Sequence, residues 1–171
     1  MDARTNCTPE QLHHFWWKIW PEAVRDFQNG GIHLQVTDAT GEIKRSPASR
    51  PDLVGLQRGV LNLVLTDHIP MYWDRGQALA GVTTFYEGYH VSMIAIRYAH
   101  GDQIPFLSVN TCVHEILHAL LQDIFLTRGK WFHSGEHEFR VDWYGTMLWL
   151  HDGAAVRESA RQYLARLRSP V

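Results

Sequence analysis

Two histidines and a glutamate form the most informative cluster of reactive side chains in this 171-residue sequence. His114 and His118 are four residues apart, and on a helix such residues share a face with β-carbons about 5–6 Å apart. They could therefore offer two imidazole nitrogens to one metal ion. Glu115 follows the first histidine and could reach a water on that ion without binding the ion itself. The segment predicts a metal centre that activates water.

An amphipathic helix must carry this cluster. Asn110 or Thr111 can begin the helix, because either side chain can accept hydrogen bonds from unpaired N–H groups at a helix start. Apolar residues then recur at spacings of three and four, which is the helical pattern, at Val113, Ile116, Leu117, Leu120, Leu121 and Ile124. A His-Glu-x-x-His segment on a helix is the arrangement found in zinc peptidases. Zinc is therefore the expected ion.

A further zinc ligand must come from elsewhere in the chain, because a catalytic zinc usually has three protein ligands and keeps one position for water. The downstream candidates are His133, His137, Glu138 and Asp142. His137 directly precedes Glu138 and would point about 100° away from it on a helix, so both cannot easily bind one zinc. Cys112 points to a different side of its helix from His114. The residues alone leave the third ligand open.

The spacing of these residues resembles that of the gluzincin group of zinc peptidases, thermolysin-like enzymes in particular. Those enzymes supply a glutamate from a second helix and, four residues later, an aspartate that orients a ligand histidine. Here Glu138 comes twenty positions after His118, and Asp142 comes four after Glu138. The resemblance implies that His114, His118 and Glu138 bind zinc and that Asp142 accepts a hydrogen bond from His114. It covers about thirty residues, with Val141 where the family has a small residue.

The same resemblance implies hydrolysis of a peptide or protein substrate. Zinc lowers the pKa of a bound water toward about 7, and Glu115 would act as the general base. A peptide would lie along an edge strand, for which residues 80–84 are the expected segment. Gly81 in that segment either permits a close approach or only ends a turn. The helix pair also resembles that of regulatory peptidases that cleave transcriptional repressors.

Two other classes of function remain open for the same residues. A non-catalytic domain could hold a structural zinc, with His133 filling the fourth position that such sites usually close with Cys or His. A zinc hydrolase that acts on something other than peptides would use the same motif.

The elements that must position these residues predict an α+β, zincin-like fold. Thr8-Pro9 begins an N-terminal helix with a capping residue and a proline at its first position, and Pro21 should kink that helix. Four strands of a small mixed sheet with an edge strand are expected at residues 32–36, 60–65, 82–86 and 90–97. Glu87-Gly88 should join the last two as a hairpin.

The C-terminal third of the chain should be helical and carry the remaining site residues. After the helix of His114 we expect a loop at residues 127–135, then a helix over residues 136–150 begun by Ser134. Asp152-Gly153 separates it from a final helix. Surface loops are expected around residues 37–51 and 70–76.

The composition, 45% apolar and 20% charged, is that of a globular protein, and residues 1–171 are expected to form one domain. A formal charge of −2 argues against a nucleic-acid partner, which would need a basic surface. No stretch approaches the roughly 18 apolar residues of a membrane helix. The first residues lack an apolar signal region, so we expect a cytoplasmic protein, or a secreted one whose signal peptide has been removed.

Overall fold

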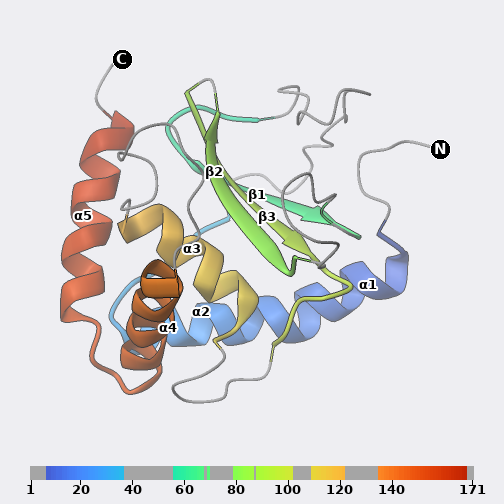
Figure 1. Ribbon diagram of the computed structural model, residues 1–171, viewed down its shortest axis with the longest axis horizontal. Coiled ribbons are helices and arrows are strands. Elements are labelled where there is room, and N and C mark those ends of the chain that lie inside the picture. The colour runs from blue at the N-terminus through green and yellow to red at the C-terminus, as the bar shows by residue number, and fades with distance from the viewer. Residues whose placement is uncertain are drawn as a thin grey trace.

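The protein is α+β, with helices packed on a small mixed sheet (Figure 1). The computed structural model describes residues 7–36, 56–67, 69, 79–86, 88–101, 109–121 and 135–168. The loops expected around residues 37–51 and 70–76, most of the one at 127–135, and the capping residue Ser134 lie outside these ranges. No helix among the described residues is both long and apolar enough to cross a membrane.

The N-terminal helix has three parts, α1 (Pro9–His14), a π-helical turn (Phe15–Ile19) and α2 (Trp20–Asn29). It begins as expected, because Thr8 accepts a hydrogen bond from the Gln11 N–H at 3.2 Å while the Gln11 side chain accepts one from the Thr8 N–H at 2.8 Å. In the wider turn, the Trp20 N–H donates to the Phe15 carbonyl five residues earlier. The helical irregularity therefore comes immediately before Pro21.

The sheet has three strands, β1 (Leu61–Thr66), β2 (Gly81–Tyr86) and β3 (Tyr89–Ala95), in the order β1-β3-β2. β1 runs parallel to β3, whereas β2 pairs with it antiparallel, so β2 is an edge strand of the described sheet. The expected hairpin is present, and Gly88 in its turn has a φ of 84° that favours glycine.

The strand expected at residues 32–36 is not formed. Ile32 and Leu34 alternate with polar residues, but they pack against the main core without pairing with another strand. Burial of alternate residues thus produced the pattern that was interpreted as a strand, and the described sheet has three strands instead of about four.

The two faces of the sheet bury different sets of residues. Leu61, Leu63 and Leu65 pack against the main core, which also contains the buried residues of α2 and α3. Val64 and Val91 join Leu56 in a smaller cluster. Since alternate residues of a strand point to opposite faces, one face is covered by α2 and α3 and the other by the smaller cluster.

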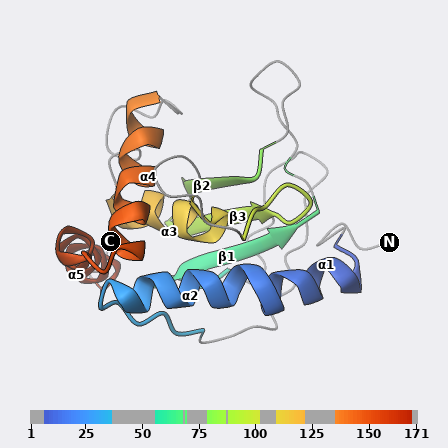
Figure 2. The same cartoon turned by 90° about the horizontal axis from the view of Figure 1, so that it is seen from below.

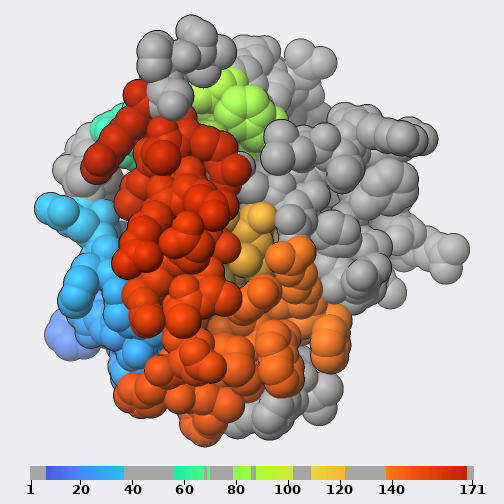
Figure 3. Space-filling model, turned by 90° about the vertical axis from the view of Figure 1, so that its left-hand side faces the viewer, coloured from blue at the N-terminus to red at the C-terminus, as the bar shows by residue number. Residues whose placement is uncertain are grey.

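Three further helices complete the fold: α3 (Thr111–Leu121), α4 (Gly135–Trp149) and α5 (Ala154–Arg168). Asn110 begins α3, as expected, because its Oδ1 accepts a hydrogen bond from the Cys112 N–H at 2.9 Å. In Figure 2, α3 lies among the sheet, α2 and α4. From the side of α5, α3 is visible only as a small patch between α5 and α4 (Figure 3). Nine of its eleven residues are buried.

Candidate metal centre

The buried helix α3 carries His114, Glu115 and His118, whose ligand atoms all lie within 4.8 Å of one another. Among the described residues, this is the one group of three or more such side chains that could hold a metal ion. His118 has a fully buried side chain, whereas 17% of the His114 side chain is exposed. The group therefore lies at the boundary between the core and solvent.

Glu138, on the second turn of α4, reaches both histidines. Its Oε2 lies 2.9 Å from Nε2 of His114, and its Oε1 lies 3.4 Å from Nε2 of His118. The two histidine Nε2 atoms are 2.8 Å apart. Bonds of about 2.0–2.1 Å to a tetrahedral zinc would hold ligand atoms about 3.3 Å apart. Two imidazole nitrogens and one carboxylate thus converge closely enough to share one zinc ion.

Asp142, one turn after Glu138, contacts the other nitrogen of the first histidine. Its Oδ1 lies 3.0 Å from Nδ1 of His114. A carboxylate at this atom fixes the tautomer of the ring and leaves Nε2 to face the metal position. The Thr146 hydroxyl in turn donates to the Asp142 carbonyl at 2.9 Å, within α4.

The charges around His114 favour its protonated form when no cation is bound. Burial alone lowers the pKa of this histidine, but hydrogen bonds to Asp142 and Glu138, together with the negative charge of Glu115, raise it to about 10. A cluster of carboxylates that stabilises a positive charge at Nε2 would also stabilise a metal ion there. The electrostatics of the site therefore suit a cation.

Glu115 points from α3 toward the edge strand β2, and its side chain is almost fully buried, with the residue 3% exposed. The Thr83 hydroxyl lies 2.7 Å from Oε2 of Glu115. A β-carbon added to Gly81 would lie 2.5 Å from Oε1. Gly81 therefore permits a close approach, namely that of Glu115 to the backbone of β2.

Nothing in the sequence alone singles out Thr83 or Ser92. These residues face each other across β2 and β3, with hydroxyl oxygens 2.9 Å apart. The available signal was only that a hydroxyl residue occurs in each of two predicted strands that a hairpin should place side by side. Their relation to Glu115 depends on strand register and on the position of α3, which the sequence does not give.

Cys112 lies apart from this centre, as its position on the helix predicts. It is fully buried in the main core, and burial raises the pKa of its thiol above the usual range. A buried neutral thiol is a poor metal ligand, because the thiolate is the form that binds metals. His133 and the side chain of His137, the other ligand candidates, lie outside the described residues.

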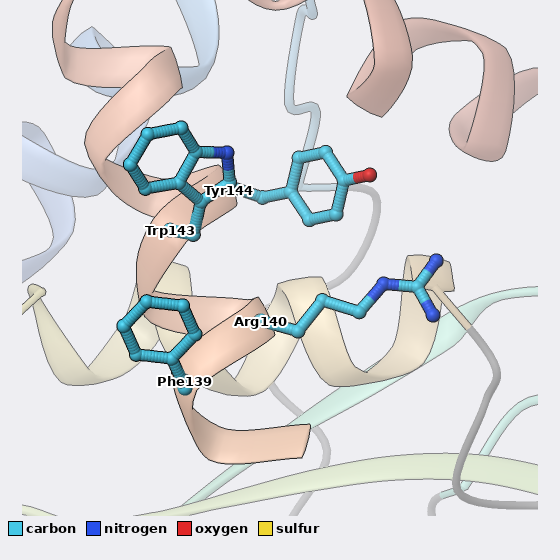
Figure 4. Close-up of a pocket in the computed structure, with 4 residues that line it drawn as sticks. All are labelled: Phe139, Arg140, Trp143 and Tyr144. Atoms are coloured by element: carbon cyan, nitrogen blue, oxygen red, sulfur yellow. The ribbon is translucent and has the colours of Figure 1, made fainter. Parts of the chain in front are cut away.

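An open hollow of about 410 Å³ lies on α4 directly after Glu138. Phe139 and Trp143 project from one side of the helix, and Arg140 and Tyr144 from the other (Figure 4). The Arg140 guanidinium lies over the Tyr144 ring, 5.8 Å from its centroid. Tyr144 also packs against the main core.

Comparison with known protein families, characterised proteins and solved structures finds no match to this chain.

Proposed function

We propose that this protein is a zinc-dependent hydrolase, and specifically a peptidase of the zincin type. The observation that carries the proposal is the convergence of two Nε2 atoms and the Glu138 carboxylate, at 2.8–3.4 Å, beside a buried glutamate that does not need to bind the ion. The order of elements supports it, since an N-terminal helix and a mixed sheet precede the motif helix and a glutamate-bearing helix.

In this proposal His114, His118 and Glu138 hold the zinc ion. Zinc supplies a Lewis acid that polarises the scissile carbonyl and makes water more acidic. Glu138 is a better third ligand than Glu115, because its two oxygens already lie beside both histidine Nε2 atoms. Glu115 instead has one oxygen, Oε2, hydrogen-bonded to Thr83.

Glu115 is the general base. Its carboxylate accepts a proton from the attacking water and passes it to the leaving amine. The burial of this carboxylate limits competition from bulk water. Asp142 orients His114 and takes no part in proton transfer to the substrate.

The edge strand β2 favours a peptide over other substrates. Glu115 lies directly against this strand, at Gly81 and Thr83. An extended peptide could pair through its backbone with the edge of β2 that has no neighbouring strand in the described sheet, and its scissile bond would then pass near Glu115. This is the segment, residues 80–84, that the sequence suggests for the role.

The first test is the zinc content of the purified protein, measured by elemental analysis. We expect about one zinc per chain in the wild type and a large loss in Glu138→Ala. Glu158→Ala, at an exposed glutamate of α5, is the matched control and should retain zinc. Zinc retained at full affinity in Glu138→Ala would move the third ligand to another residue. Zinc absent from every protein after reconstitution would overturn the proposal.

The second test is cleavage of a fluorescence-quenched peptide library by the zinc-loaded protein. Glu115→Gln should keep its zinc and lose about 10²–10⁴-fold in kcat, because only the proton acceptor is removed. Full activity in this variant would contradict the mechanism. A wild type that binds zinc but cleaves no peptide would favour a non-peptidase hydrolase or a structural zinc site.

A further inference from the structure

The face of the sheet that meets α3 contains an unusual pair of buried polar residues. Thr83 and Ser92 are 4% and 0% exposed, and they are directly opposite each other in β2 and β3. Their neighbours on β1 and β3, Leu63 and Ile94, pack in the apolar core. Burying two hydroxyl groups in such a face is unfavourable unless both are hydrogen-bonded.

Both hydroxyl groups meet Glu115. Thr83 Oγ1 lies 2.7 Å from Oε2 and 2.8 Å from the main-chain carbonyl oxygen of Glu115. Ser92 Oγ lies 2.9 Å from Thr83 Oγ1 and 3.3 Å from the same carbonyl oxygen. Residues from two strands therefore contact a single residue of α3, through both its side chain and its backbone.

The number of available hydrogens decides how these contacts are arranged. A threonine hydroxyl has one proton to donate, so Thr83 cannot donate to Oε2 and to the main-chain carbonyl oxygen of Glu115 at the same time. The carboxylate is the closer and the stronger acceptor, because hydrogen bonds to charged groups are the strong ones. Ser92 then donates to Thr83 Oγ1 or to the carbonyl. Every buried hydroxyl in the group has an acceptor in this arrangement.

The two oxygens of Glu115 consequently have different surroundings. Oε2 is hydrogen-bonded to Thr83, whereas Oε1 faces Gly81, where any side chain would collide with it. The carboxylate is held between a hydroxyl on one side and bare backbone on the other. Rotation of the carboxylate would break the bond to Thr83.

We propose that Thr83, supported by Ser92, is a positioning residue that fixes the Glu115 carboxylate through its Oε2. The inference rests on the proposed function, since it assigns Thr83 a part in the work of that general base. Thr83 does not touch the substrate or the zinc ligands in this assignment. It restricts the conformations of the group that does the chemistry.

The test compares three substitutions in the zinc-loaded full-length protein. Thr83→Val keeps the shape of the side chain and removes the hydroxyl, whereas Thr83→Ser keeps the hydroxyl. Thr66→Val is the matched control, because Thr66 is a buried threonine at the end of β1, at the opposite edge of the described sheet from β2. Zinc content and melting temperature are measured for each variant, and kinetics with the library peptide that the wild type cleaves fastest.

We expect Thr83→Val to retain zinc and to lose about 10- to 100-fold in kcat with little change in KM. Thr83→Ser should recover most of the rate, and Thr66→Val should have the kcat of the wild type. A crystal structure of Thr83→Val should show the Glu115 carboxylate rotated or in several conformations. An unchanged kcat together with an unchanged Glu115 conformation would overturn the inference.

These outcomes separate the inference from the function on which it rests. If Glu115→Gln is inactive and Thr83→Val is fully active, the proposed hydrolase function stands and the positioning role of Thr83 is wrong. If the wild type cleaves no peptide, the crystal structures still decide, because an ordered Glu115 in Thr83→Val contradicts the role assigned to Thr83. If Thr83→Val does not fold, Ser92→Ala removes the supporting hydroxyl and should produce the same loss in kcat on a smaller scale.

Discussion

At the scale of single residues, Asp142 has the clearest indirect effect on metal binding. Its carboxylate lies 3.0 Å from Nδ1 of His114, the nitrogen that faces away from the metal position, so it acts through the orientation and basicity of that ring. Part of the affinity for zinc should therefore depend on a residue that never contacts the ion.

Replacing Asp142 with alanine should lower the affinity for zinc by about 10- to 100-fold. Competition with a chromophoric chelator would measure the change. Asp152→Ala, at an exposed aspartate between α4 and α5, is the control and should leave the affinity unchanged. Equal affinities in wild type and Asp142→Ala would mean that His114 does not need its partner.

His114 should make the zinc-free protein lose stability at alkaline pH. Its pKa in the folded protein is about 10, above the ordinary value of 6.5. A raised pKa gives a stabilising contribution that is complete below pH 6.5 and is lost as the pH rises through about 10. Urea unfolding in the presence of a chelator at pH 6, 8 and 10 would measure this decline.

Asp142→Asn is the comparison for that experiment, because it weakens the hydrogen bond from the Asp142 carboxylate that raises the His114 pKa. The decline in free energy of unfolding between pH 6 and pH 10 should be smaller in this variant. The same decline in both proteins would show that groups other than His114 control stability in this range.

At the scale of elements, Asn110 connects the N-terminal helix to the start of α3. Its Oδ1 accepts hydrogen bonds from the N–H groups of Cys112 and Val113, at 2.9 and 3.4 Å. Its Nδ2 donates to the Ile19 carbonyl at 2.9 Å, at the end of the π-helical turn. One fully buried amide therefore satisfies groups at the termini of two different helical segments.

Asn110→Ala should lower the free energy of unfolding by about 2–3 kcal/mol, because it leaves buried backbone groups without partners. Thr8→Ala removes a cap from an exposed helix end and should cost only about 1 kcal/mol. Chemical denaturation of both variants tests the difference. Similar costs for the two would indicate that water or another side chain replaces Asn110.

At the scale of the whole molecule, two glycines join the N-terminal and C-terminal parts of the chain. Gly30 ends α2, Gly153 precedes α5, and a β-carbon on Gly153 would collide with the backbone of Gly30. Arg157 of α5 donates to the Gly30 carbonyl at 2.6 Å. The C-terminal end of α2 and the residue that precedes α5 are therefore in backbone contact.

Gly153→Ala should lower the free energy of unfolding by about 1–3 kcal/mol, because an added methyl group must push the two segments apart. Ala155→Ser, at an exposed position in the first turn of α5, should change it little. Thermal and urea unfolding would test both. Wild-type stability in Gly153→Ala would mean that this contact is easily adjusted.

Local signals in the sequence predicted much of this architecture. The capping residues Thr8 and Asn110 are where helices begin, and the Glu87-Gly88 hairpin lies between β2 and β3. The spacing of Glu138 from His118 anticipated a contact between two helices. The first two signals depend on residues that are close together in the chain. The third depends on the resemblance of the Glu138 spacing to that of the gluzincin peptidases.

Features that depend on tertiary packing could not be predicted in the same way. Ile32 and Leu34 have strand-like alternation but do not pair with any strand of the described sheet. Thr83 and Ser92 are ordinary strand residues until α3 brings Glu115 against them. The periodicity of apolar residues predicts which side chains are buried, but it does not predict which other elements they pack against.

The π-helical turn in the N-terminal helix restricts the number of residues that this helix can have. Phe15, Ile19, Ala23 and Phe27 are all fully buried at strict intervals of four. In an ideal α-helix each interval of four advances about 40°, so this row would wind away from the core. The π-helical turn, in which the Trp20 N–H donates to the Phe15 carbonyl, contains one residue more than an α-helical turn. The extra residue offsets that rotation.

Deleting one residue from the turn, such as the exposed Trp17, would restore a regular helix and rotate α1 by about 100°. Gln11 would then move away from Asp67, the residue that follows β1. In the present structure the Gln11 Nε2 donates a hydrogen bond to the Asp67 carboxylate at 2.7 Å. The length of this helix is thus matched to the sheet, and shortening it by a single residue would detach its first two turns.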